Sequence, residues 1–239
     1  MTDLLLKGRI ALVTGASRGI GAAVAEGLGR AGAHVVLLAR TLGGLEAVDD
    51  KIRAAGGTAT LMPMDLTDFT KIDALGAALN ERFGKLDIFV GNAGMLGVLG
   101  PLAHMKAKDW QQIMDLNVTA NFRLIRTLDP LLQKSDAGRA VFVTSGMGNE
   151  IIEAYWGAYG VSKAALSTLV KTYAAETEKT SIRVNIVRPG VVETALLAKA
   201  FPGGYPGATQ KPEAVVPAFL DLCAPSCSRH GAVVDLYRE

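Results

Sequence analysis

The chain has 239 residues, of which 49% are hydrophobic and 20% charged, and its formal net charge is +2. This length fits one α/β domain with a substantial core, so we expect residues 1–239 to form a single domain. The small net charge and the scattered lysines and arginines exclude a strong electrostatic demand for nucleic acid or an anionic membrane.

The same sequence predicts a cytoplasmic protein without a metal site. The leucine run in "MTDLLLKG" is too short for the core of a signal peptide, and the other apolar runs have the length of strands. Cys223 and Cys227 are interpreted as ordinary thiols in a reduced setting, because His230 does not complete a tetrahedral ligand set with them. The remaining histidines offer no metal set or triad either.

Short apolar runs alternate with longer segments of helical period along the chain. The runs are rich in Val, Ile and Leu on both alternating faces, which is typical of parallel strands covered by helices on both sides. The pattern predicts a Rossmann-like, doubly wound sheet of about seven parallel strands flanked by helices. The predicted strands are 9–14, 34–39, 58–64, 86–91, 139–144, 182–187 and 231–237, and helices are expected from 19 and over 42–55, 68–83, 107–134 and 155–179.

A glycine-rich turn, "TGASRGIG" (14–21), follows the first predicted strand and leads into a helix. Gly15, Gly19 and Gly21 allow a tight reversal and a close approach of backbone to a pyrophosphate, and the helix N-terminus offers free N–H groups. We therefore expect residues of this turn to bind a dinucleotide, with Ser17, Arg18 and Ile20 beside the glycines. The alternative is a glycine-rich turn without a ligand.

The end of the second strand indicates which dinucleotide is preferred. Ala39 stands where folds that prefer NAD place a carboxylate, and Arg40 follows it. Arg18 and Arg40 would pair with a 2′-phosphate, so NADP(H) is the preferred cofactor and NAD(H) the second option. The alternative for Arg40 is a solvated residue at a helix start. Further cofactor contacts are expected from Asp65 and Leu66 and from Asn92, Ala93 and Gly94.

Several motifs occur in a fixed order: "TGASRGIG", "NAG" (92–94), Asn117, Ser145 and Tyr159-x-x-x-Lys163. With this ordered set the chain resembles the classical short-chain dehydrogenase/reductase family over nearly everything from residue 9 to residue 236. The stretches "LLQKSDAG" (131–138) and "AYWGAY" (154–159) are also similar to a poorly characterised bacterial branch of oxidoreductases.

The resemblance implies a role for each matching residue. Ser145 is expected to polarise the substrate oxygen, Tyr159 to donate or accept its proton, and Lys163 to hold the nicotinamide ribose and lower the pKa of Tyr159. Asn117 is expected to fix a water that links Lys163 to solvent; the alternative is that its amide bonds to backbone. The motif "RPGVVET" implies cofactor contacts from Pro189, Gly190, Val192 and Thr194.

The spacing of Tyr159 and Lys163 places both on one face of a helix. A free tyrosine has a pKa of about 10, and bringing it near neutrality requires about 4 kcal/mol. An ammonium about 4 Å away supplies about that much at an effective dielectric constant near 20, whereas burial opposes it. Tyr159 is therefore the expected proton donor, and Tyr155, eight residues before Lys163, is expected to pack or to line the pocket.

The predicted substrate pocket is largely apolar, and no arginine or lysine obviously marks a carboxylate. Its residues are Ser145, Met147, Ile151, Trp156, Tyr159 and Phe201, and residues 201–212 form an exposed loop or lid. The expected function is NADP(H)-dependent interconversion of a small-molecule carbonyl and a secondary alcohol. The alternatives are a 3-oxoacyl-thioester reductase and, in another class, a nucleotide-sensing protein without turnover.

The resemblance also implies assembly. The helices expected over 107–134 and 155–179 would pair in a four-helix interface, so we expect a homodimer, with a homotetramer as the alternative. Asp235 lacks the glycine pair that follows the last strand in the family, which argues against the usual tetramer contact.

Overall fold

The computed structural model describes residues 4–237 and contains one sheet. Seven strands follow the order β3-β2-β1-β4-β5-β6-β7, and every neighbouring pair is parallel. The doubly wound parallel sheet is thereby confirmed. The strand order reverses between β1 and β4, and sheets of this kind bind ligands beyond the carboxyl ends of the strands at that point.

Most elements lie close to their predicted bounds. The strands are β1 Ile10–Thr14, β2 His34–Ala39, β3 Thr58–Pro63, β4 Ile88–Gly91, β5 Arg139–Val143, β6 Arg183–Arg188 and β7 Val233–Asp235. The helices are α1 Gly19–Arg30, α2 Leu42–Ala54, α3 Phe69–Phe83, α4 Ala107–Met114, α5 Ala120–Leu132, α6 Gly157–Thr177, α7 Ala195–Ala200 and α8 Val216–Cys223. Short turns of other helix types are η1 Leu102–His104, η2 Asp115–Thr119 and η3 Pro212–Val215.

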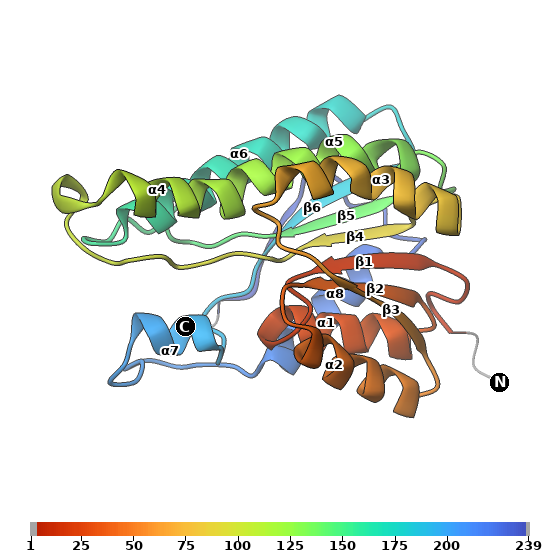
Figure 1. Ribbon diagram of the computed structural model, residues 1–239, viewed down its shortest axis with the longest axis horizontal. Coiled ribbons are helices and arrows are strands. Elements are labelled where there is room, and N and C mark those ends of the chain that lie inside the picture. The colour runs from red at the N-terminus through yellow and green to blue at the C-terminus, as the bar shows by residue number, and fades with distance from the viewer. Residues whose placement is uncertain (1–3, 238–239) are drawn as a thin grey trace.

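The sheet separates two hydrophobic cores. Helices α3, α5 and α6 cover one face, and α1, α2 and α8 cover the other (Figure 1). Successive residues of β2 alternate between the cores: Val35 and Leu37 face the α1 side, and Val36 and Leu38 face the α3 side. Because each fully buried side chain of this kind contributes about 1.5–3 kcal/mol, both faces must be apolar, which explains the continuous hydrophobic runs.

The helix predicted over 107–134 is interrupted. Between α4 and α5 lies the π-turn η2, in which the N–H of Ala120 donates to the carbonyl of Asp115, five residues back. Such π-turns often occur at functional sites, and Asn117 is the central residue of this one. The prediction of one continuous helix was wrong here because helical periodicity in a sequence does not reveal a single wider turn.

Residues 194–209 form a flap that is closed at its base. Val192 and Gln210 pair as an isolated bridge, and the side-chain amide of Gln210 donates to the carbonyl of Pro189 at 2.6 Å. The flap contains α7, which the sequence did not predict; Thr194 caps it by accepting the N–H of Leu197. Figure 1 shows α7 across a gap from α4, below the sheet edge.

Candidate active site

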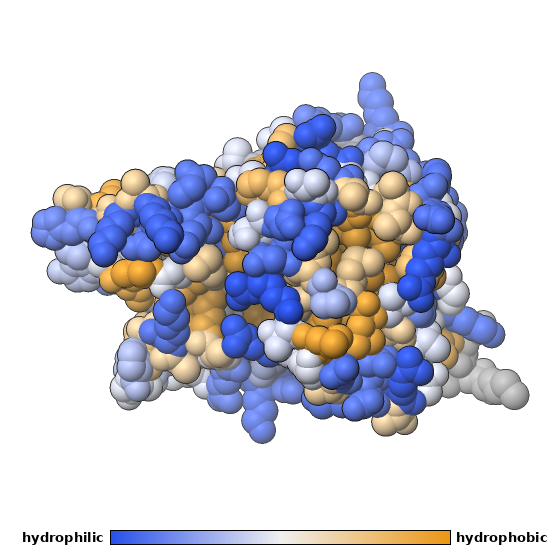
Figure 2. Space-filling model, in the orientation of Figure 1, coloured by the Kyte–Doolittle hydropathy of each residue, from blue (hydrophilic) through white to orange (hydrophobic). Residues whose placement is uncertain are grey.

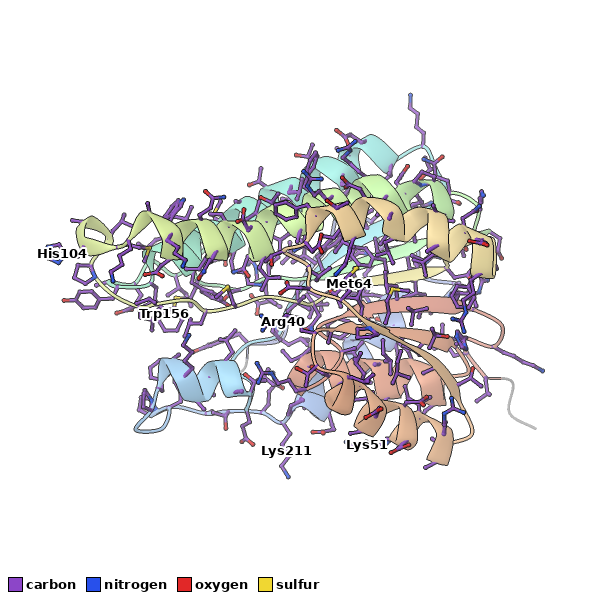
Figure 3. The ribbon with its side chains drawn as sticks, viewed as in Figure 1. Arg40, Lys51, Met64, His104, Trp156 and Lys211 are labelled. Atoms are coloured by element: carbon purple, nitrogen blue, oxygen red, sulfur yellow. The ribbon has the colours of Figure 1, made fainter. Side chains whose placement is uncertain are left out.

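A cleft of about 2070 Å³ runs past the carboxyl ends of the strands. Figure 2 shows the surface hollowed between the segments of α4 and α7, with apolar side chains gathered in the hollow. Among the labelled residues of Figure 3, Arg40 lies near the middle of the gap and Trp156 towards its α4–α7 end. A cleft of this volume is large enough to hold a dinucleotide and a second molecule.

Nearly all the residues predicted from the sequence meet in this cleft. The lining includes Gly15, Ser17, Arg18, Gly19, Ile20, Arg40, Asp65, Leu66, Asn92, Ala93, Gly94, Ser145, Met147, Ile151, Trp156, Tyr159, Lys163, Pro189, Gly190, Val192, Thr194 and Phe201. Gly21 and Asn117 are not part of it. These two act behind the cleft wall.

The glycine turn is held by close backbone packing. Gly15 has φ +66°, and a Cβ on Gly21 would lie 2.2 Å from the carbonyl oxygen of Gly15. The hydroxyl of Thr14 accepts the N–H groups of Asn92 at 3.0 Å and Ala93 at 3.1 Å, which ties this turn to the loop after β4. Gly21 thus shapes the turn rather than contacting a ligand directly.

The turn and its surroundings fit a dinucleotide. No side chain caps the N-terminus of α1 and its first turn has no acidic residue, so N–H groups with a positive dipole end face the cleft. The hydroxyl of Thr144, which also lines the cleft, is buried without a hydrogen-bond partner. The N–H groups of α1 and the Thr144 hydroxyl are therefore free to donate hydrogen bonds to the phosphate and amide groups of such a cofactor.

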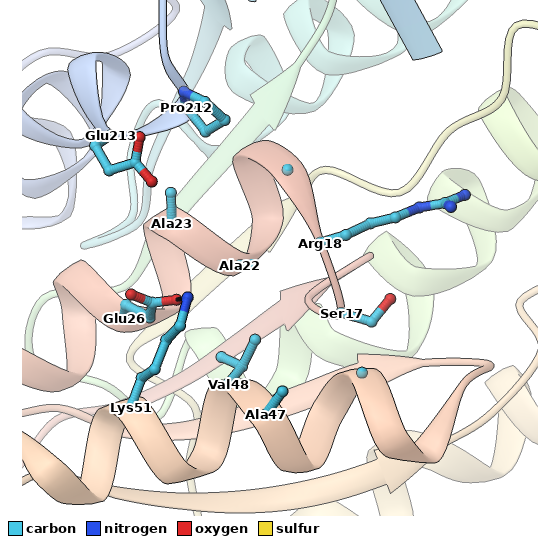
Figure 4. A pocket seen from close by; sticks show the side chains of 12 residues that line it. Ser17, Arg18, Ala22, Ala23, Glu26, Ala47, Val48, Lys51, Pro212 and Glu213 are labelled. Atoms are coloured by element: carbon cyan, nitrogen blue, oxygen red, sulfur yellow. Dashed lines mark hydrogen bonds and ion pairs between the residues drawn. The ribbon is translucent and has the colours of Figure 1, made fainter. Parts of the chain in front are cut away.

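The end of the cleft beside β2 carries two exposed arginines, Arg18 and Arg40. Burial raises the pKa of Asp65, but hydrogen bonds from the backbone and hydroxyl of Thr67 and the nearby charge of Arg40 outweigh it, so that pKa is lowered. A smaller pocket of about 200 Å³ adjoins this end between α1 and α2 (Figure 4). There Lys51 pairs with Glu26 at 2.9 Å, while Arg18 points away from that pair.

Tyr159 and Lys163 lie on α6 and are almost fully buried, with exposed fractions of 8% and 4%. The Lys163 ammonium donates to the carbonyl of Val143 at 3.0 Å and lies 5.8 Å from the centre of the Tyr159 ring. Ser145 follows β5; its hydroxyl accepts the N–H of Met147 at 3.1 Å and lies close enough to Tyr159 to lower the pKa of that phenol. The serine, the tyrosine and the lysine therefore line the same cleft, with the lysine ammonium near the tyrosine ring.

The pKa values of this pair differ from the expectation. Burial raises the pKa of Tyr159 to about 12, although the hydrogen bond with Ser145 lowers it in part. Burial also lowers the pKa of Lys163 to about 8. Burial therefore dominates the pKa of Tyr159, and the Lys163 ammonium donates to the carbonyl of Val143; the lowering of the tyrosine pKa by Lys163 stays a prediction.

Asn117 is fully buried in η2, and its amide is engaged with protein groups. Its oxygen accepts the N–H of Met95 at 2.8 Å, and its nitrogen donates to the carbonyl of Met95 and to the hydroxyl of Ser162, both at 2.9 Å. The amide therefore bonds to the backbone of Met95, while the expected role of Asn117 in fixing a water stays a prediction. A Cβ on Gly94 would lie 3.3 Å from this oxygen and 3.4 Å from the Lys163 nitrogen, so the three residues converge.

The other end of the cleft is walled by aromatic side chains. The rings of Trp156 and Tyr159 lie 5.9 Å apart, those of Trp156 and Phe201 6.0 Å, and those of Phe201 and Tyr205 4.9 Å. This series connects α6 with the flap. Tyr155 does not belong to it: its ring is 61% exposed, its φ is +73°, and the prediction that it packs or lines the pocket was wrong.

Sequence reasoning missed a group of charged residues in the cleft, namely Glu150, Arg188 and Asp235. Arg188 pairs with Glu150, and its guanidinium lies 3.8 Å from the carboxylate of Asp235. The only signal was the arginine directly before Pro189. Its partners could not be found because they follow other strands of the sheet.

Residues 4–237 contain neither a cluster of metal-ligating side chains nor a helix that could span a membrane. In this part of the chain no three His, Cys, Asp or Glu side chains gather at a site that could hold a metal ion. Among the same residues, no helix combines the length and apolar character needed to cross a bilayer.

Comparisons with known proteins agree with this geometry. The family model for short chain dehydrogenases matches residues 9–203. The uncharacterised oxidoreductase YciK of Escherichia coli K12 is 38% identical over 221 residues, covering 91% of this chain and 87% of that protein. A short chain dehydrogenase structure from Pseudomonas syringae has a TM-score of 0.92 and 39% identity, covering 98% of this chain and 96% of that one.

A second solved structure, a short chain dehydrogenase of Shigella flexneri 2a complexed with NADP, also has a TM-score of 0.92. It is 36% identical and covers 98% of this chain and 99% of that one. Family model, relatives and structures therefore agree with the order of motifs in the sequence. The chain belongs to the short chain dehydrogenase family of oxidoreductases.

Proposed function

We propose that the protein is an NADP(H)-dependent oxidoreductase that interconverts a carbonyl group and a secondary alcohol. The observation that carries this proposal is the meeting of Ser145, Tyr159 and Lys163 in the cleft that also holds the glycine turn. The exposed Arg18 and Arg40 support NADP(H) over NAD(H), because two guanidinium groups can pair with a 2′-phosphate. The complex of the Shigella relative with NADP supports the same choice.

In this proposal the protein's residues orient and polarise the substrate. When bound, the nicotinamide supplies the hydride for reduction or accepts it for oxidation. The Ser145 hydroxyl donates a hydrogen bond to the carbonyl oxygen, and Tyr159 donates its phenolic proton to that oxygen as it becomes an alcohol. Lys163 holds the nicotinamide ribose, and Asn117 positions the loop at Met95 beside it. Pro189, Gly190, Val192 and Thr194 line the same cleft and would contact the carboxamide side of the cofactor.

The raised pKa of Tyr159 should make the two directions of the reaction depend on pH in different ways. Because burial raises that pKa to about 12, the phenol is protonated throughout the neutral range and ready to donate. Oxidation requires the phenolate, whose population rises with pH. We therefore expect the rate of alcohol oxidation to increase steadily from neutral to alkaline pH. The rate of carbonyl reduction should show no such increase with pH.

The test is a screen of carbonyl compounds with NADPH and of secondary alcohols with NADP, followed by absorbance of the reduced nicotinamide. Turnover of simple carbonyls supports the proposal. Activity confined to 3-oxoacyl thioesters would favour a thioester reductase. Tight cofactor binding without any turnover would contradict the proposal and favour a nucleotide-sensing protein.

We also propose that residues 1–239 act as one domain that assembles as a homodimer. Phe122 on α5 and Val161 on α6 are 45% and 43% exposed, and such side chains are common at interfaces between copies of one chain. Light scattering on the purified protein measures the assembly. A single species of 25.1 kDa would contradict the dimer.

A further inference from the structure

The charged residues missed by the sequence lie at the substrate end of the cleft. Arg188 ends β6 and Asp235 ends β7, and the two are partners in the register of these neighbouring strands. Glu150 belongs to the loop after β5 and pairs with Arg188. All three line the cleft that contains Ser145 and Tyr159.

The loop that carries Glu150 is short and tightly bonded to the proposed catalytic serine. The N–H of Glu150 donates to the carbonyl of Gly146 at 3.1 Å, and the amide of Asn149 donates to the carbonyl of Ser145 at 2.8 Å. A Cβ on Gly148 would lie 1.9 Å from the carbonyl oxygen of Gly160, so this loop rests directly on α6. The backbone of Glu150 is thus held in place in the loop that follows Ser145, and its carboxylate pairs with Arg188 in the same cleft.

Burial differs sharply between the charges of this group. The side chain of Arg188 is 9% exposed, whereas those of Glu150 and Asp235 are 58% and 49% exposed. A molecule in the cleft therefore meets the two carboxylates, while the guanidinium lies behind them. The group as a whole carries one positive and two negative formal charges, and one guanidinium donor, the Nε of Arg188, is buried without a partner.

We propose that Glu150 is a specificity-determining residue that excludes anionic substrates by covering Arg188, so that the enzyme selects uncharged carbonyl compounds. This inference rests on the proposed function. A substrate carboxylate placed at this wall would meet Glu150 and Asp235 and be repelled by both. An uncharged substrate meets no such cost and can pack on the aromatic wall of Trp156 and Phe201.

Removing one negative charge should weaken this selectivity. In Glu150→Gln the amide oxygen can still accept from Arg188, so the loop keeps its shape while the formal charge of the group rises from −1 to zero. Arg188 then retains only the Asp235 carboxylate, at 3.8 Å. The Arg188 guanidinium then has an unpaired Nε donor and one negative charge fewer beside it. It therefore becomes able to pair with a substrate carboxylate.

The experiment compares reduction of methyl benzoylformate and of benzoylformate by NADPH, because the ester and the acid share one skeleton and differ in charge. We expect wild type to prefer the ester, and Glu150→Gln to raise the acid-to-ester ratio of kcat/KM at least tenfold. Adding Asp235→Asn should raise the ratio further. Adding Arg188→Met to Glu150→Gln should remove the gain, which separates pairing with the guanidinium from a general loss of negative charge.

Glu153→Gln is the matched control, because Glu153 is exposed and outside the cleft. It should leave the ratio unchanged. Wild-type preference for the acid, an unchanged ratio in Glu150→Gln, or an equal rise in Glu153→Gln would each overturn this inference alone, since turnover itself would uphold the proposed function. Failure of every chain to reduce the ester, or any other uncharged carbonyl, would overturn both.

Discussion

Buried charges differ between the two edges of the sheet, meaning the edge formed by the amino ends of the strands and the edge formed by their carboxyl ends. At the amino-terminal edge, Asp87 is fully buried and accepts hydrogen bonds from Arg9 at 3.1 Å, Lys85 at 2.9 Å, Ser135 at 2.6 Å and the N–H of Ile10 at 2.9 Å. At the carboxyl-terminal edge, Lys163 is buried, and among residues 4–237 the Val143 carbonyl is its one hydrogen-bond acceptor.

The pKa values show the consequence. Burial raises the pKa of Asp87, but its hydrogen bonds from Ser135, Ile10 and Lys85 outweigh burial and lower it. Nothing outweighs burial at Lys163, so its pKa falls to about 8. One edge therefore stabilises its buried charge, and the other holds a charge at a cost in stability, which is typical of a site arranged for chemistry.

Substituting Asp87 should have the largest effect on stability. In Asp87→Ala, Lys85 and part of the Arg9 interaction lose their buried partner, so we expect the free energy of unfolding to fall by about 3 kcal/mol. Denaturant unfolding measures this change. Turnover per folded molecule should stay close to that of wild type. A loss of turnover without destabilisation would show that Asp87 serves the reaction rather than the stability of the fold.

The contribution of Asp87 should also depend on pH. Its folded-state pKa lies below the ordinary value of 3.8, so the contribution is fully present above about that pH and is lost as pH falls through the lower folded value. The stability gap between wild type and Asp87→Ala should therefore narrow only in strong acid. Unfolding curves across this range check it, and a gap that closes near neutral pH would contradict the account.

At the carboxyl-terminal edge, removing the buried charge should increase the free energy of unfolding rather than decrease it. Lys163→Met should raise the free energy of unfolding by about 2 kcal/mol near pH 7, because it removes a buried charge and loses one hydrogen bond. Since the pKa of Lys163 falls from 10.5 to about 8 on folding, wild-type stability should approach that of the variant as pH rises between these values. Destabilisation by Lys163→Met at pH 7 would show that this edge does not hold its charge at a cost.

The smallest effect is expected where a charge is exposed. Arg40 lines the part of the cleft that we propose for the adenosine, and Arg40→Ala should weaken NADPH binding about tenfold while leaving NADH binding and stability nearly unchanged. Calorimetric titration of both cofactors measures the difference. Equal weakening of NADPH binding and NADH binding would show that Arg40 does not pair with the 2′-phosphate.

The sequence predicted the parts of this molecule that local patterns determine. The apolar runs revealed the strands, and the glycines at 15, 19 and 21 revealed the turn because only backbone packing without Cβ atoms allows it. The α7 helix was missed because six residues give too little periodicity. The engagement of Asn117 with Met95 and the pairing of Glu150 with Arg188 were missed because they depend on which segments the fold brings together.

The most direct test of the central claim is the rate of carbonyl reduction by NADPH in Tyr159→Phe, which keeps the ring contact with Trp156 and removes only the hydroxyl. We predict a loss of turnover of about 100-fold or more, with NADPH binding and the free energy of unfolding essentially unchanged. Turnover equal to that of wild type would contradict the assignment of Tyr159 as the proton donor.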